Sequence, residues 1–167
     1  MSLIDRIVTI LTDEGARFQT YDDAVVLGFT GRSTRFTVEI VPRDPLIRFV
    51  VTVEAVVPEA RRAETLALAN ILNARRVPWG AFWLDPRDGA LAFELALPVL
   101  GDLDPETLRF ALAATATLDA FWPAFGRVIW ANEGAESALA AWANDPPPPP
   151  ASALSEAADT DDPLLTI

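Results

Sequence analysis

The chain has 167 residues, with 24 acidic side chains against 13 basic ones, and its formal net charge is −11. All 13 basic residues are Arg, and the sequence holds no Lys, His or Cys. Without these three residue types there is no Ser–His triad, thiolate nucleophile, Schiff-base lysine or His/Cys zinc site. We therefore expect a protein that is not an enzyme and has no cofactor, although carboxylates could still hold Mg²⁺ or Ca²⁺.

Length and charge also limit the compartment and the partners. A chain of this length is expected to form one domain, and its hydrophobic fraction of 51% favours a globular protein over a disordered one. The first residues show no signal peptide and no apolar run approaches a membrane span, so with the absence of Cys we expect a cytoplasmic protein. The negative charge would repel nucleic acid and anionic membrane surfaces, which leaves a protein or peptide as the expected partner, a basic segment being the better match.

The N-terminal third predicts a helix followed by an antiparallel meander. Apolar residues spaced three and four apart predict an amphipathic helix over residues 3–11, with Ser2 as its N-cap. The segments that follow are apolar runs or alternate between apolar and polar residues, which predicts strands with one face in water. These predicted strands cover residues 17–21, 24–29, 34–40 and 47–55.

A second helix is predicted to begin at Pro58, because proline at this position needs no amide hydrogen. Its apolar stripe predicts one buried face that includes Asn70 as a core amide bonded to the backbone. A hairpin follows, with strands over 81–84 and 91–97 joined by a turn in which Gly89 takes a positive φ. The predicted stripe consists of Ala63, Leu66, Ala67, Asn70, Ile71 and Ala74.

The C-terminal part predicts further helices. Asp104 and Pro105 are typical of a helix start, and Pro123 is expected to kink or restart that helix. Two more helical stretches are expected over 124–130 and 135–142.

The composition changes at Asp145. Five consecutive prolines, Pro146–Pro150, are followed by a segment that is rich in small and acidic residues and has no basic residue. The sequence therefore divides into a domain at 1–144 and a Pro-rich, acidic, flexible tail at 145–167. The prolines act either as a spacer or as a recognition motif for an aromatic groove.

Basic and aromatic residues around the second predicted helix are the candidates for partner contact. Two arginine pairs on this helix could bind an acidic segment, even the chain's own tail, or could simply form a solvated face. Two tryptophans around the second hairpin belong either to the core or to an apolar contact patch. The candidate partner-binding residues are Trp79, Trp83, Arg61, Arg62, Arg75 and Arg76.

Acidic residues at the turns offer an alternative, a small-ligand or divalent-metal site. Asp22, Asp85, Asp88 and Glu94 would form such a site only if they met in one pocket. Each of the aspartates also fits a simple turn or capping role. We therefore predict no metal ligand and no catalytic residue, and keep ligand binding as the second hypothesis.

One stretch of the chain has a recognisable pattern. It combines a helix bearing Asn70 and Asn73, an aromatic-rich strand over 79–85, and an Asp88–Gly89 turn that leads to a strand ending in Leu-Pro. This pattern resembles the YbjN family of bacterial proteins, described as sensory-transduction regulators, and the similarity covers roughly residues 1–133.

The resemblance implies a fold and the kind of role. The family's fold is similar to that of type III secretion chaperones, which are small, acidic α/β proteins and commonly dimers. It implies no catalytic residue, and structural roles for Asn70 and Asn73, beside the turn residue Gly89.

The predicted fold class is α+β in two layers, with an antiparallel sheet of about five strands and helices on one face, in the order α-β-β-β-α-β-β-α. We expect a non-enzymatic protein-interaction module, chaperone-like or regulatory, that binds a protein or peptide and forms a homodimer.

Overall fold

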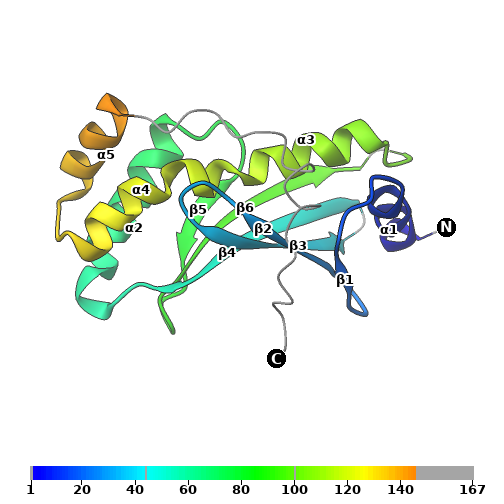
Figure 1. The fold of residues 1–167 in the computed structure, drawn as a ribbon, viewed down its shortest axis with the longest axis horizontal. Coiled ribbons are helices and arrows are strands. Elements are labelled where there is room, and N and C mark those ends of the chain that lie inside the picture. Colours follow the sequence, from blue (N-terminus) through cyan, green and yellow to red (C-terminus); the bar gives the residue numbers. More distant parts are fainter. Residues whose placement is uncertain (1, 44, 100, 146–167) are drawn as a thin grey trace.

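The computed structural model describes residues 2–43, 45–99 and 101–145. The tail predicted at 145–167 therefore lies, apart from Asp145, outside the described residues. Within the described part, six strands form one sheet and five helices accompany it (Figure 1). The helices are α1 Leu3–Asp13, α2 Glu59–Arg75, α3 Pro105–Thr115, α4 Thr117–Trp130 and α5 Ala135–Asn144. The strands are β1 Gln19–Thr20, β2 Val25–Thr30, β3 Arg35–Arg43, β4 Leu46–Val56, β5 Ala81–Leu84 and β6 Ala90–Pro98.

The sheet has the order β1-β2-β3-β4-β6-β5, and every neighbouring pair is antiparallel. Alternation along the strands sends one set of apolar side chains to the core, as the sequence predicts. One row of directly opposed residues crosses five strands, and all its members are buried. A shift of one residue in the pairing of a strand would move its buried side chain to the solvent-facing side of the sheet, so burial of this row fixes the register of the strands. The row consists of Leu27, Val38, Val51, Phe93 and Phe82.

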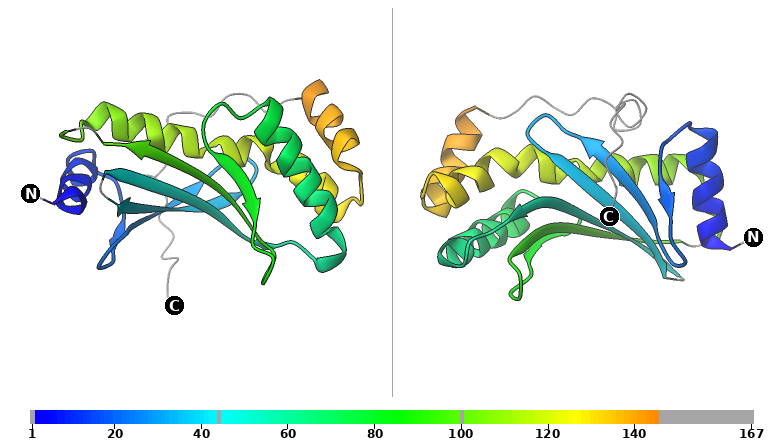
Figure 2. Two further views of the ribbon diagram at one scale, coloured as in Figure 1. Left: turned by 180° about the vertical axis from the view of Figure 1, so that it is seen from behind. Right: turned by 60° about the horizontal axis from the view of Figure 1, so that its bottom comes forward.

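The helices form the second layer. Helices α2, α3 and α4 cover the buried face of the sheet, α5 packs on α2 and α4, and α1 lies at the end of the sheet near β1 (Figures 1 and 2). The predicted α+β class with helices on one face is confirmed. The sheet has six strands instead of about five, because two residues of the predicted stretch 17–21 pair with β2 as β1. None of the described helices is both long enough and apolar enough to cross a membrane.

The helix break near the C-terminus is not where the sequence predicts it. The chain turns at Ala116, between α3 and α4, and Pro123 lies inside α4, so the predicted restart at Pro123 is wrong. The hydroxyls of Thr115 and Thr117 donate to carbonyls of the preceding turn at 2.5 and 2.7 Å. Such bonds compete with the helical ladder, and they favour the break at this position.

Helix α2 buries a different face from the predicted stripe. Leu66 is 41% exposed and Asn70 is exposed, so the prediction of Asn70 as a core amide is wrong. Apolar residues lie on several sides of this helix, which makes a buried stripe ambiguous in the sequence. The buried positions are Thr65, Leu68, Ala69 and Leu72.

Candidate interaction surface

The N-terminal end of α2 is fixed inside the domain by its arginine pair. The Arg61 guanidinium donates to the carbonyls of Val128 and Glu133 at 2.7 and 2.9 Å and to Asn132 Oδ1 at 2.7 Å. Arg62 donates to the carbonyls of Val57 and Pro86. These two candidate residues therefore connect α2 to the end of α4 and to the β5–β6 hairpin, and their donors are directed inward.

Asn73 connects α2 to the edge strand β5. Its side-chain amide donates to the Phe82 carbonyl at 3.0 Å, and its Oδ1 accepts from the Phe82 amide at 2.8 Å. The side chain thus satisfies both backbone groups of Phe82, as a neighbouring strand would. This edge of the sheet is blocked at its centre, which disfavours addition of a partner strand there.

We expect Asn73→Ala to lower the free energy of unfolding by about 2 kcal/mol, because two part-buried backbone groups lose their partners. Asn70→Ala is the matched control: it lies on the same helix, is exposed, and is expected to stay within about 0.5 kcal/mol of the wild type. Urea unfolding followed by circular dichroism measures both. Equal effects of the two substitutions would contradict the structural role of Asn73.

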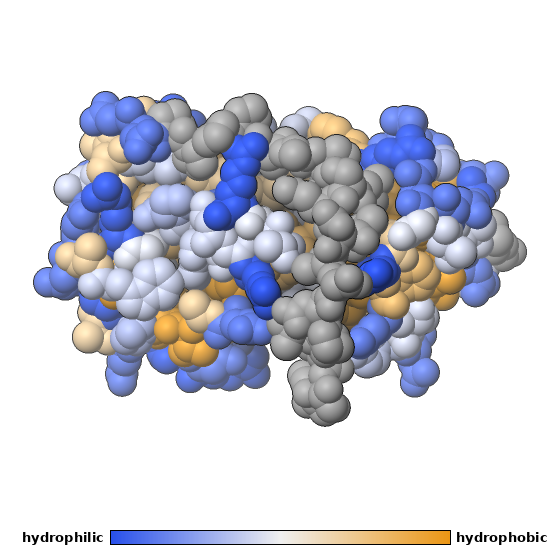
Figure 3. Space-filling model, in the orientation of Figure 1, coloured by the Kyte–Doolittle hydropathy of each residue, from blue (hydrophilic) through white to orange (hydrophobic). Residues whose placement is uncertain are grey.

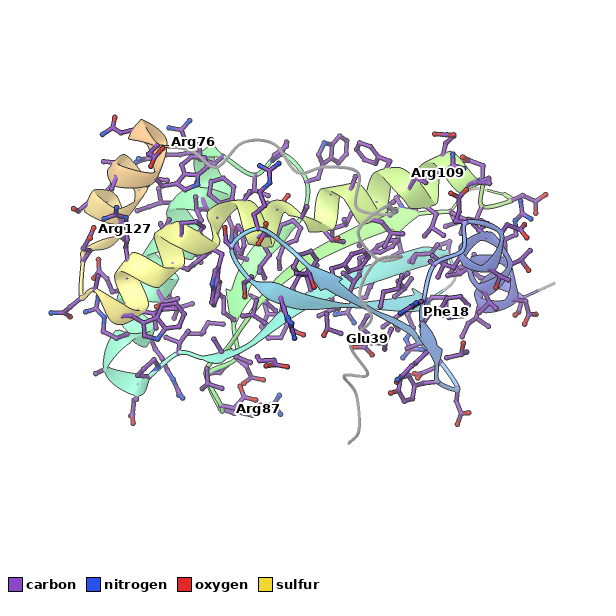
Figure 4. The ribbon with its side chains drawn as sticks, in the orientation of Figure 1. Phe18, Glu39, Arg76, Arg87, Arg109 and Arg127 are labelled. Atoms are coloured by element: carbon purple, nitrogen blue, oxygen red, sulfur yellow. The ribbon has the colours of Figure 1, made fainter. Side chains whose placement is uncertain are left out.

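The β5–β6 turn is organised by Asp85. Its carboxylate accepts from the backbone amide of Arg87 at 2.8 Å and from the Arg87 guanidinium at 2.6 Å. These hydrogen bonds from Arg87 lower the pKa of Asp85 from 3.8 to about 2. Arg87 itself lies at the tip of the hairpin, away from the helical layer (Figure 4).

The lowered pKa predicts a stability change in acid. The fold favours the ionised form of Asp85, so its contribution is complete above pH 4 and is lost as the pH falls towards 2. We expect Asp85→Asn to be less stable than the wild type at pH 6 and to lose less stability between pH 4 and pH 2. Thermal unfolding across this pH range tests this; parallel curves for the two proteins would contradict it.

The acidic residues of the second hypothesis do not meet. Asp22 lies in the β1–β2 turn, whereas Asp85 and Asp88 lie in the β5–β6 turn. Glu94 accepts two hydrogen bonds of 2.8 Å from Arg48 on the neighbouring strand β4, and this pairing raises the pKa of Arg48. Among the described residues no group of three or more Asp or Glu side chains could hold a metal ion.

The C-terminal end of α2 carries the second arginine pair, and it is exposed. Arg75 makes a 3.5 Å ion pair with Glu136 of α5. Arg76 lies beside the end of α5 (Figure 4). Within the described residues it is the only one of the 13 arginines whose side chain has no hydrogen bond or ion pair. Both arginines border an open depression of about 290 Å³, lined by Arg75, Arg76, Glu136, Leu139, Ala140 and Ala143.

Two exposed aromatic side chains lie near this end of α2. Trp79, three residues after Arg76, is 58% exposed, and its ring meets that of Phe110 edge-on with centroids 6.3 Å apart. Phe110 on α3 is 53% exposed. We call Trp79 and Phe110 the aromatic pair. On the face shown in Figure 3 apolar residues are scattered among hydrophilic ones, and Trp79 and Phe110 are two of eight large hydrophobic side chains in the described chain that are more than a third exposed.

The structure separates the candidate residues into three places. Trp79 and the second arginine pair lie close together, whereas the first arginine pair lies about 21 Å away along α2. Trp83 lies on the open face of the sheet, because its neighbour Phe82 on β5 points into the core. Phe110 was not predicted as a contact residue, although it stands between Leu108 and Leu112, which form the buried face of α3, and is itself turned away from that face.

The arrangement defines a class of protein: a two-layer α+β domain with an exposed aromatic pair beside a basic helix end. The YbjN family profile, described as "Putative bacterial sensory transduction regulator", matches residues 3–127. The chain belongs to the YbjN family.

A solved structure supports the fold. The crystal structure of YbjN from E. coli, described as "a putative transcription regulator", is similar with a TM-score of 0.56 and 18% identity. The similarity covers 78% of this chain and 92% of that one. At this identity the likeness extends to the fold alone. A search of curated protein sequences found no match.

Proposed function

We propose that this chain is a non-enzymatic protein-interaction module with a regulatory, chaperone-like role, and that it binds a protein or peptide partner. Membership of a family described as regulators supports the regulatory role. The observation that carries the proposal is the aromatic pair of Trp79 and Phe110. Large aromatic side chains are enriched at the centres of protein interfaces, and here two of them stand more than half exposed.

The charges beside the pair indicate the chemistry of the partner. The Arg76 side chain has no partner within the described residues, and Arg75 has only a solvent-exposed ion pair of 3.5 Å with Glu136. An apolar segment that carries an acidic residue would cover the rings and pair with Arg76. We propose that the partner contacts this surface through such a segment. We also propose that the protein acts in the cytoplasm, because the absence of Cys fits a reducing compartment.

Affinity capture with three forms of the full chain tests the proposal. The wild type is compared with Trp79→Ala/Phe110→Ala and with Tyr21→Ala, which removes another exposed aromatic ring. We expect a partner whose recovery falls about tenfold or more in the double variant and is unchanged in the control. Identical sets of recovered proteins for the wild type and the double variant would overturn the proposal.

We also propose that the chain forms a homodimer. Light scattering coupled to size-exclusion chromatography distinguishes a mass near twice 18.1 kDa from a mass of 18.1 kDa. The larger value is expected. A monomer over the whole concentration range would remove the dimer from the proposal and leave partner binding by a single chain.

A further inference from the structure

The aromatic pair is suited to one particular kind of ligand. Proline-rich segments in the extended polyproline conformation bind between exposed aromatic rings, because their conformation is already fixed and little entropy is lost. Trp79 and Phe110 come from different elements, the α2–β5 connection and α3, and their rings meet nearly at right angles, at 89°. Both rings therefore offer a face or an edge to a ligand that lies across them.

The same chain carries such a segment close by. The described chain ends at Asp145, directly after α5, and the next five residues are Pro146–Pro150. Ala143 near the end of α5 borders the same depression as Arg76. Trp79 follows Arg76 by three residues, which places their Cα atoms within about 11 Å of one another.

The length of the proline run fits this span. Five residues in the polyproline conformation extend over about 15 Å. This exceeds the distance of about 11 Å between the Cα atoms of Arg76 and Trp79, so a run that lies along Arg76 can extend to the aromatic pair. A run directed away from the domain would leave both rings in water.

Charge favours the same direction. The segment after the prolines contains Glu156, Asp159, Asp161 and Asp162 and no basic residue. The domain itself is acidic, and among the described residues Arg76 is the arginine whose guanidinium makes neither a hydrogen bond nor an ion pair. The segment is thus attracted to the end of α2 and repelled by most of the remaining surface.

We propose that Pro146–Pro150 bind the aromatic pair of their own chain. This contact covers the rings with an internal ligand, so an external partner must displace the prolines before it can bind. The competition with an external partner rests on the proposed function, whereas the contact between the prolines and the rings can form without any partner.

The absence of Cys allows a direct test on the full chain. Ala151→Cys takes a single nitroxide label next to the proline run, and the tryptophan indole N–H signals are recorded by nitrogen-15 NMR. Trp79→Phe assigns the Trp79 signal. We expect the label to broaden the Trp79 signal strongly and the signal of Trp130 weakly, although Trp130 is equally exposed.

A second variant distinguishes binding of the prolines to the rings from the closeness that results only because the label is covalently connected to the end of α5. Replacement of Pro146–Pro150 by Gly-Ser-Gly-Ser-Gly keeps the length of the tether and removes the ligand. We expect the broadening at Trp79 to fall at least severalfold in this variant.

Three results would overturn the proposal: no broadening at Trp79, equal broadening in the Gly–Ser variant, or broadening that appears only when label and nitrogen-15 are on different molecules. The last would assign the pair to a second copy of the chain. None of these results depends on a partner, so they are independent of the capture experiment.

Discussion

Asp119→Ala is expected to lower the free energy of unfolding by about 3 kcal/mol, because it removes the acceptor of three backbone amides. Asp119 on α4 is only 6% exposed. Its Oδ2 accepts from the amide of Arg32 at 2.9 Å, and its Oδ1 accepts from those of Ser33 and Thr34 at 2.9 and 3.0 Å. One carboxylate thus accepts hydrogen bonds from three backbone amides of the β2–β3 turn and connects that hairpin to the helical layer.

Two further variants show whether the carboxylate itself matters. Asp119→Asn keeps one acceptor oxygen but turns an amide donor towards a backbone N–H, so we expect an intermediate loss of stability. Asp13→Ala removes the same charge from an exposed position and is expected to stay within about 0.5 kcal/mol of the wild type. Urea unfolding of the three variants gives the comparison. A loss in Asp119→Ala no larger than in Asp13→Ala would contradict the role of Asp119.

Gly89→Ala is expected to cost about 3 kcal/mol, from two separate causes. Gly89 has a φ of +82°, which an L-residue adopts only with strain of about 1 kcal/mol. A Cβ at this position would also lie 2.5 Å from the Val57 carbonyl oxygen, which is backbone, and 2.9 Å from Arg62. The Gly89 carbonyl accepts from the Val57 amide at 2.9 Å, so the turn cannot move away without loss of this bond.

Gly15→Ala isolates the conformational part of this cost. Gly15 has a similar φ of +71°, but a Cβ there would meet nothing within 4 Å. We expect Gly15→Ala to cost about 1 kcal/mol, and the difference between the two variants to measure the close approach of the β5–β6 turn to Val57, in the connection between β4 and α2, and to the Arg62 side chain. Thermal or urea unfolding would contradict this if the two substitutions had the same effect.

The strands follow from the sequence more directly than the helices do. In β3, β4 and β6 the alternation of apolar and polar residues predicts which side chains face the core, and these side chains are the buried ones in the structure. Helix α2 has apolar residues on several sides, and its buried face is decided by contacts with α4, α5 and β5. Its orientation therefore depends on tertiary packing, which single-sequence periodicity does not contain.

Long-range contacts explain what the sequence did not predict about the surface. In the sequence, Arg61 and Arg62 are typical of a solvated basic pair. In the structure, their hydrogen-bond acceptors come from the end of α4 and from the β5–β6 hairpin, which are far away in the chain. The role of Asp119 depends on a turn about 85 residues earlier in the chain. A signal did exist, because Asp119 is the only charged residue between Arg109 and Arg127. A lone carboxylate in an apolar helix indicates a buried acceptor.

The contact surface around Trp79 is tested most directly by site-specific photo-crosslinking of the full chain. Pro78→Cys introduces a unique thiol beside the aromatic pair, and Tyr21→Cys introduces one at a distant exposed position; each is coupled to a benzophenone. In an extract of the cells that make the protein, we predict a crosslinked protein partner from position 78 and not from position 21. Crosslinks from position 21 alone, or equal products from both positions, would contradict a partner site at the aromatic pair.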